Sequence, residues 1–73
     1  MKEEIRTLLA EALPLVDIDS DFLFAELDSL GITTILMLLS DRYGITLDHK
    51  DVTPKNFRSL ESLCDMVTSK LQT

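Results

Sequence analysis

The sequence contains few of the residues that cross-link or interrupt a chain: one cysteine, two glycines, two prolines and no tryptophan among 73 residues. The single cysteine, Cys64, cannot form a disulfide within the chain, so side-chain packing must hold the fold, as is usual for cytosolic domains. Glycine and proline are too scarce for a low-complexity or disordered chain, and no internal repeat is visible. The sequence therefore predicts an ordinary folded domain.

Long apolar runs are also absent. No stretch approaches the roughly 20 apolar residues of a membrane-spanning helix, and the start lacks the basic segment and apolar run of a secretory signal. We therefore expect a cytoplasmic protein without membrane insertion. A chain this short buries only about 60% of the surface that its unfolded form exposes, so we expect one monomeric domain over residues 1–73 without a deep enzyme cleft.

Basic residues are outnumbered, with 7 Lys and Arg against 13 Asp and Glu and a formal net charge of −6. Such a surface repels nucleic acid phosphates and anionic membranes, and it attracts basic protein surfaces. A helix-turn-helix DNA-binding domain would suit the number of helices expected below but not this charge. We expect protein partners and no binding to nucleic acid.

Apolar residues at helical spacing predict a first helix from Lys2 to Leu13, which Pro14 ends. Residues 15–28 mix acids and large apolar side chains without a regular period, which predicts a long loop pinned to the core. A last helix should begin after the capping residue Ser59. Its apolar face would consist of Leu60, Leu63, Cys64, Val67 and Leu71.

A central helix is predicted from Ser29 to Tyr43, with Asp28 or Ser29 as the cap and Gly44 as the stop. Its inward face would consist of Ile32, Ile35, Leu36, Leu39 and Tyr43, which leaves Leu30 and Met37 facing the other way.

The segment from Thr46 to Phe57 is polar, and Thr53 with Pro54 suits the start of a short turn or single-turn helix, with Phe57 as an anchor in the core. The fold class is therefore all-α. We predict a small four-helix bundle of three main helices and a short third helix, with the long loop between helices 1 and 2.

The stretch Leu27-Asp28-Ser29-Leu30 follows the long loop and directly precedes the central helix. In this order and position, and over essentially the whole chain, the sequence resembles the acyl carrier protein family. In that family the serine of an Asp-Ser-Leu motif is esterified with 4′-phosphopantetheine from coenzyme A. The resemblance implies that Ser29 carries this cofactor, with Asp28 and Leu30 beside it, and that acyl or aminoacyl groups travel on it as thioesters. A phosphodiester at a helix start is also stabilised by roughly 0.3 to 1 kcal/mol.

The resemblance further implies a carrier without catalytic residues of its own. Leu30, Met37 and Asp41 would contact the partners, which are a phosphopantetheinyl transferase, a loading ligase and acyl-transferring synthases. The sequence departs from fatty-acid carriers where it has Gly31, Thr34 and Ser40 instead of acids, so docking should depend more on apolar contact.

The loop before the motif also departs from the family pattern. It reads Ala25-Glu26-Leu27 and lacks the glycine that many carriers place there. With Gly31, this is similar to carriers of D-alanyl and other aminoacyl groups. Fold alone does not set the cargo.

Alternatives without a cofactor stay open at this point. The chain could be a small helical interaction domain, and Ser29 could be a simple helix cap. Leu30 and Met37 could be buried against the loop that holds Phe22 and Phe24.

Other reactive side chains predict no further chemistry. His49 has no second histidine with which to share a metal, and Cys64 falls on an apolar helix face. Asp17, Asp19 and Asp21 alternate as calcium ligands do, but the glycine and the closing glutamate of an EF-hand loop are missing. We expect no metal site.

Overall fold

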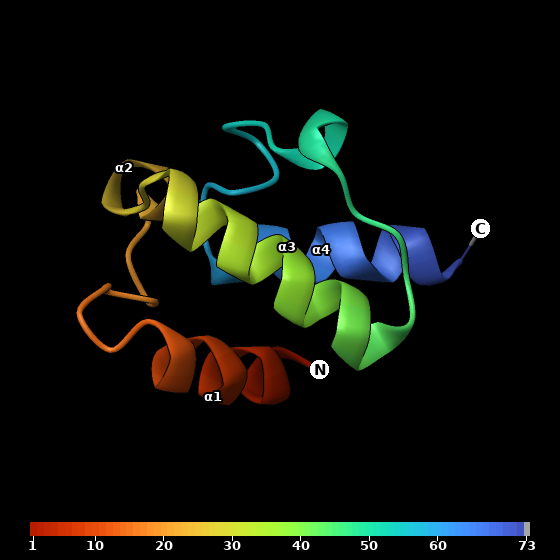
Figure 1. Ribbon diagram of the computed structural model, residues 1–73, viewed down its shortest axis with the longest axis horizontal. Coiled ribbons are helices and arrows are strands. Elements are labelled where there is room, and N and C mark those ends of the chain that lie inside the picture. The colour runs from red at the N-terminus through yellow and green to blue at the C-terminus, as the bar shows by residue number, and fades with distance from the viewer. Residues whose placement is uncertain (73) are drawn as a thin grey trace.

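Helices make up all the regular structure of residues 1–72, which are the residues that the computed structural model describes (Figure 1). They are α1 (Lys2–Ala12), α2 (Leu23–Glu26), α3 (Ser29–Tyr43), the 3-10 helix η1 (His49–Asp51) and α4 (Leu60–Leu71). Helix α1 packs against α3 and α4, which also pack against each other. Figure 1 shows α3 in the middle, with α1 and η1 on opposite sides of it and α4 behind. The predicted all-α bundle is confirmed, and the last residue of the predicted domain, Thr73, lies outside the described residues.

One hydrophobic core holds these helices together, because each main helix turns its apolar face inward. Each such side chain contributes about 1.5 to 3 kcal/mol when fully buried. The core consists of Ile5, Leu9, Ile18, Leu23, Ile35, Leu36, Leu39, Phe57, Leu60, Leu63, Met66 and Val67.

The long loop after α1 contains a helix that the sequence did not predict. Helix α2 has a single turn, and the rest of the protein holds it in place. The buried Leu23 donates its amide to the carbonyl of Arg58 at 2.8 Å. The ring of Phe24 packs edge-on against Phe57, with 6.5 Å between the ring centroids. Both contacts are with residues far along the chain, so the local sequence of the loop does not predict them.

The connector between α3 and α4 contains two short elements. At the predicted turn, Thr53 accepts hydrogen bonds from the amides of Asn56 and Phe57, each at 3.0 Å. Helix η1 precedes this turn and was not predicted. The Asp48 side chain caps η1, and Asp51 forms an ion pair with Lys70 of α4 at 3.0 Å. The connector is therefore tied to the last helix.

The predicted apolar helix faces and one predicted helix end need small corrections. The last turn of α4 extends beyond the other helices (Figure 1). Leu71 is 46% exposed rather than buried, and Met66 takes the inward position. Helix α1 ends at Ala12, one residue before the predicted end. Tyr43 is half-buried, because its hydroxyl reaches an acidic partner on α1.

No helix within residues 1–72 is both long enough and apolar enough to cross a membrane.

Candidate functional site

The start of α3 is built around the side chain of Asp28. This residue is the N-cap of the helix, and its Oδ1 accepts a hydrogen bond from the amide of Gly31 at 2.7 Å. Its carbonyl accepts the first intrahelical hydrogen bond, from the amide of Ile32 at 3.0 Å. Of the two caps that the sequence allowed, Asp28 is the one that forms.

Ser29 is the first residue of α3, and its side chain is exposed. Within residues 1–72 its hydroxyl has no hydrogen-bond partner, because Asp28 already occupies the capping position. The reading of Ser29 as a simple cap is therefore wrong. The structure presents a free hydroxyl at the positive end of a helix 15 residues long.

These features fit a phosphopantetheine group on Ser29. The hydroxyl oxygen is open to an approaching enzyme, and the amides of Ser29 and Leu30 precede the first intrahelical hydrogen bond. Such amides, together with the helix dipole, favour an anion. Ser29 would hold the phosphate, and the first turn of α3 would stabilise its charge.

Gly31 has a role that the sequence did not reveal. A Cβ atom at this buried position would lie 3.3 Å from Asp28 Oδ1 and 3.3 Å from Leu27 Cδ2. The absence of a side chain thus lets the Asp28 carboxylate close over the helix start. A glycine inside a helix costs about 0.5 to 1 kcal/mol relative to alanine, and this unfavourable choice was the available signal. Gly31 belongs to the cap and not to an exposed docking face.

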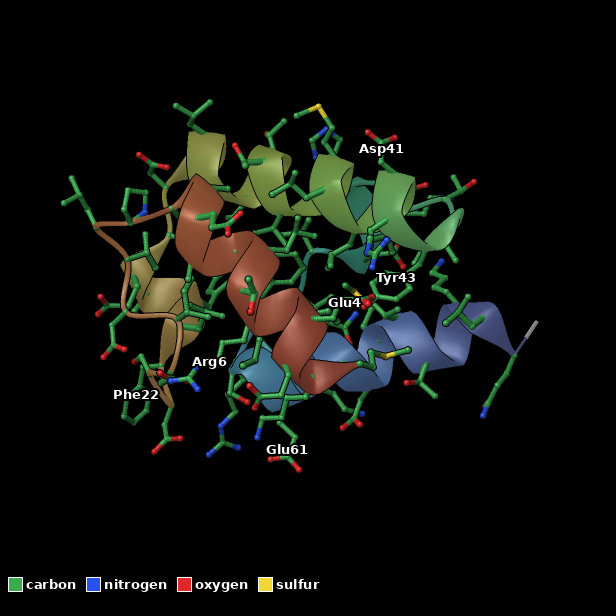
Figure 2. All side chains as sticks on the ribbon, turned by 90° about the horizontal axis from the view of Figure 1, so that it is seen from below. Glu4, Arg6, Phe22, Asp41, Tyr43 and Glu61 are labelled. Carbon is green, nitrogen blue, oxygen red and sulfur yellow. The ribbon has the colours of Figure 1, made fainter. Side chains whose placement is uncertain are left out.

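The predicted partner contacts share one exposed face of α3. Leu30 is 74% exposed, Met37 is 58% exposed and Asp41 is exposed, and they lie about two turns and then one turn apart along the helix. Figure 2 shows Asp41 pointing away from α1. The alternative that the loop buries Leu30 and Met37 is wrong, because both side chains are exposed, as is Phe22 of that loop.

A groove of about 390 Å³ borders this face. Met37 and Leu36 line it from α3, and residues 47–49 line it from the opposite side. His49 is exposed there. An apolar side chain of a partner that reached Met37 would meet both walls.

The other end of α3 is fixed to α1 by three polar side chains. The Tyr43 hydroxyl donates to Glu4 Oε1 at 2.7 Å, and Arg42 pairs with Glu4 Oε2 at 2.7 Å. Figure 2 shows Tyr43 and Glu4 meeting between the two helices. Burial and then the hydrogen bond to Glu4 raise the pKa of Tyr43 to about 12. The hydrogen bonds from Tyr43 and Arg42 hold the pKa of Glu4 below its usual value.

Other reactive side chains considered in the sequence analysis are partly buried or engaged in local ion pairs and hydrogen bonds. Cys64 is half-buried, and burial raises the pKa of its thiol, which disfavours the nucleophilic thiolate. In the acidic loop, Asp19 forms an ion pair with Arg6 at 2.7 Å, and the Asp17 carboxylate accepts a hydrogen bond from the amide of Asp19 at 3.2 Å. Over residues 1–72 no three histidine, cysteine or acidic side chains gather where they could hold a metal ion.

Comparison with known proteins gives one match. A family model described as a phosphopantetheine attachment site matches residues 3–67, a range that runs from α1 into α4 and includes the start of α3. No curated protein and no solved structure matches the chain.

Proposed function

The chain belongs to the phosphopantetheine attachment site family, and from this premise we propose that Ser29 is the residue that bears the cofactor. Members of the family carry a covalently bound 4′-phosphopantetheine, so the protein is a phosphopantetheine-dependent carrier. We further propose that it carries acyl or aminoacyl groups as thioesters from a loading ligase to acyl-transferring enzymes.

The free hydroxyl of Ser29 is the observation that carries this proposal. The chain has six serines. The Ser20 hydroxyl accepts a hydrogen bond from the amide of Phe22, and the hydroxyls of Ser59 and Ser62 form a hydrogen bond with each other at the start of α4. The other two, Ser40 and Ser69, lie inside helices, away from any N-terminus. Ser29 alone combines exposure, an unengaged hydroxyl and a helix start among the described residues.

The attachment reaction follows from this arrangement. A bond forms between Ser29 Oγ and the phosphorus that bears pantetheine, and the bond from that phosphorus to the adenosine 3′,5′-bisphosphate half of coenzyme A breaks. A base of the transferase takes the serine proton. The cap made by Asp28 holds the backbone of Ser29 in place while the helix dipole favours the new anion.

The cofactor supplies a thiol at the end of a long arm, where the thioester forms. No side chain of the chain replaces it, because Cys64 is half-buried and burial raises the pKa of its thiol. The partners would then dock on Leu30, Met37 and Asp41, and apolar contacts would make up a large part of that interface. The likeness of the Ser29 region to aminoacyl carriers supports an aminoacyl cargo.

The test is transfer from coenzyme A. The purified protein is incubated with coenzyme A, magnesium and a broad-specificity phosphopantetheinyl transferase, and its intact mass is measured. We expect a single phosphopantetheine increment in the parent and none in Ser29→Ala. A parent that gains no mass would contradict the proposal and leave the cofactor-free interaction domain as the better reading.

A further inference from the structure

An open, mostly apolar groove of about 290 Å³ adjoins the start of α3. Residues 12–16, at the end of α1 and the beginning of the loop, form one wall, and residues 26–28 with 30–31 form the other. Ser29 lies in the chain between two lining residues, Asp28 and Leu30. This groove is distinct from the one beside Met37, and the two share no residue.

The groove has an exposed apolar rim. Leu15 is 99% exposed and Leu30 is 74% exposed, while Leu13, Val16 and Leu27 are half-buried between them. Leu15 therefore contributes almost nothing to the core. Contiguous apolar surface of this kind, with a few polar groups at its edge, commonly marks a binding site.

We propose that this groove is the resting site of the pantetheine arm. The inference rests on the proposed function, because it takes Ser29 as the point of attachment. An arm joined between two lining residues is present at an effective concentration in the millimolar range, so weak apolar contacts are enough to hold it. A free ligand of similar affinity would have to reach a similar concentration to compete.

The chemistry of the arm suits the lining. Its geminal methyl groups and methylene units are apolar, as are Leu13, Val16 and Leu27. Its amide N–H groups can donate to the carboxylate of Glu26 at the edge. The volume is near the lower limit of about 300 Å³ for small-molecule sites, so the groove suits a slender chain better than a helix of a partner.

Leu30 belongs both to this groove and to the exposed face of α3 that includes Met37. A partner that covers Leu30 would therefore remove one wall from the resting arm. Docking of the partner and release of the arm are coupled through this single side chain.

The experiment compares amide chemical shifts of the apo and cofactor-loaded forms by NMR, with loading verified by intact mass. Shifts at residues 28–31 are expected from the new bond alone. The inference predicts further shifts at Leu13, Leu15 and Val16. Leu15→Asp should abolish the shifts at Leu13 and Val16. The control Phe22→Asp, at another exposed apolar position of the same loop but outside the groove, should leave them.

The outcomes separate this inference from the proposed function. Without a mass gain, the carrier assignment itself fails and the inference falls with it. A mass gain with shifts confined to residues 28–31, or distal shifts that survive in Leu15→Asp, would overturn the inference alone. Shifts of the apo form at Leu13, Leu15 and Val16 that grow with protein concentration would assign the groove to a second copy of the chain, and would also overturn it.

Discussion

The carboxylate of Asp28 lies 2.7 Å from the amide nitrogen of Gly31, and this hydrogen bond leaves the hydroxyl of the intervening Ser29 unengaged. The capping side chain and the proposed attachment hydroxyl thus belong to neighbouring residues. A change at Asp28 should act on stability, whereas a change at Ser29 should act on modification.

Asp28→Ala should lower the free energy of unfolding by about 1 kcal/mol, within the range of 0.5 to 2 kcal/mol known for lost N-caps. Asp28→Asn should retain most of the stability, because asparagine caps helices about as well as aspartate. Urea unfolding of the three proteins measures both effects. Equal losses in the two variants would show that the charge of Asp28, and not its capping hydrogen bond, stabilises the helix.

Leu39→Ala should destabilise the protein by about 2 to 5 kcal/mol, because Leu39 is fully buried between the helices. Met37→Ala, two residues earlier on the same helix, should change the stability by less than about 0.5 kcal/mol, since its side chain faces solvent. Denaturant midpoints of both variants decide the matter. A large loss for Met37→Ala would make it a core residue and remove it from the docking face.

The three main helices and a cap at Asp28 or Ser29 could be predicted from the sequence, because apolar periodicity and capping residues are local signals. Helix α2 could not, since its single turn depends on Leu23 and Phe24 contacting residues more than thirty positions away. The exposed end of α4 at Leu71 was missed for a related reason. A periodic face shows which way a side chain points, but not whether another element covers it.

The candidate site likewise contains features that could be predicted from the sequence and one that could not. Ser29, Leu30 and Met37 could be placed at a helix start and on its outer face from spacing alone. The role of Gly31 depends on the side chains of Asp28 and Leu27, which would each lie 3.3 Å from a Cβ atom at this position. Only the structure reveals this.

Tyr43 should titrate near pH 12 in the folded protein instead of near 10. Because the folded state holds this proton more tightly, the associated stabilisation is complete below about pH 10 and is lost as the pH rises towards 12. Tyr43 is the only tyrosine and the chain has no tryptophan, so phenolate absorbance reports this group alone. Glu4→Gln should move the midpoint towards 10 without reaching it, since burial is the larger cause. A midpoint near 10 while circular dichroism still shows helix would contradict both the burial of Tyr43 and its contact with Glu4.

The transferase should recognise the carrier largely through apolar contact at Met37. Exposed charges are screened over about 8 Å at physiological salt, so the parent's rate of modification should fall only modestly between low and physiological salt. Met37→Asp should slow it about tenfold or more, as expected when a central contact worth about 1.4 kcal/mol is lost. Leu71→Asp, at an exposed position on α4, is the matched control and should behave as the parent. A steep salt dependence with a normal Met37→Asp rate would assign docking to acids such as Asp41.

The most direct test of the central claim is to locate the modification within the chain. Trypsin cleaves after Arg6 and Arg42, so one peptide of the modified protein contains Ser20, Ser29 and Ser40. Fragmentation of this peptide by mass spectrometry should place the whole phosphopantetheine increment on Ser29, and the variant Ser40→Ala should be modified as fully as the parent. An increment on Ser20 or Ser40, or full modification of Ser29→Ala, would contradict the account.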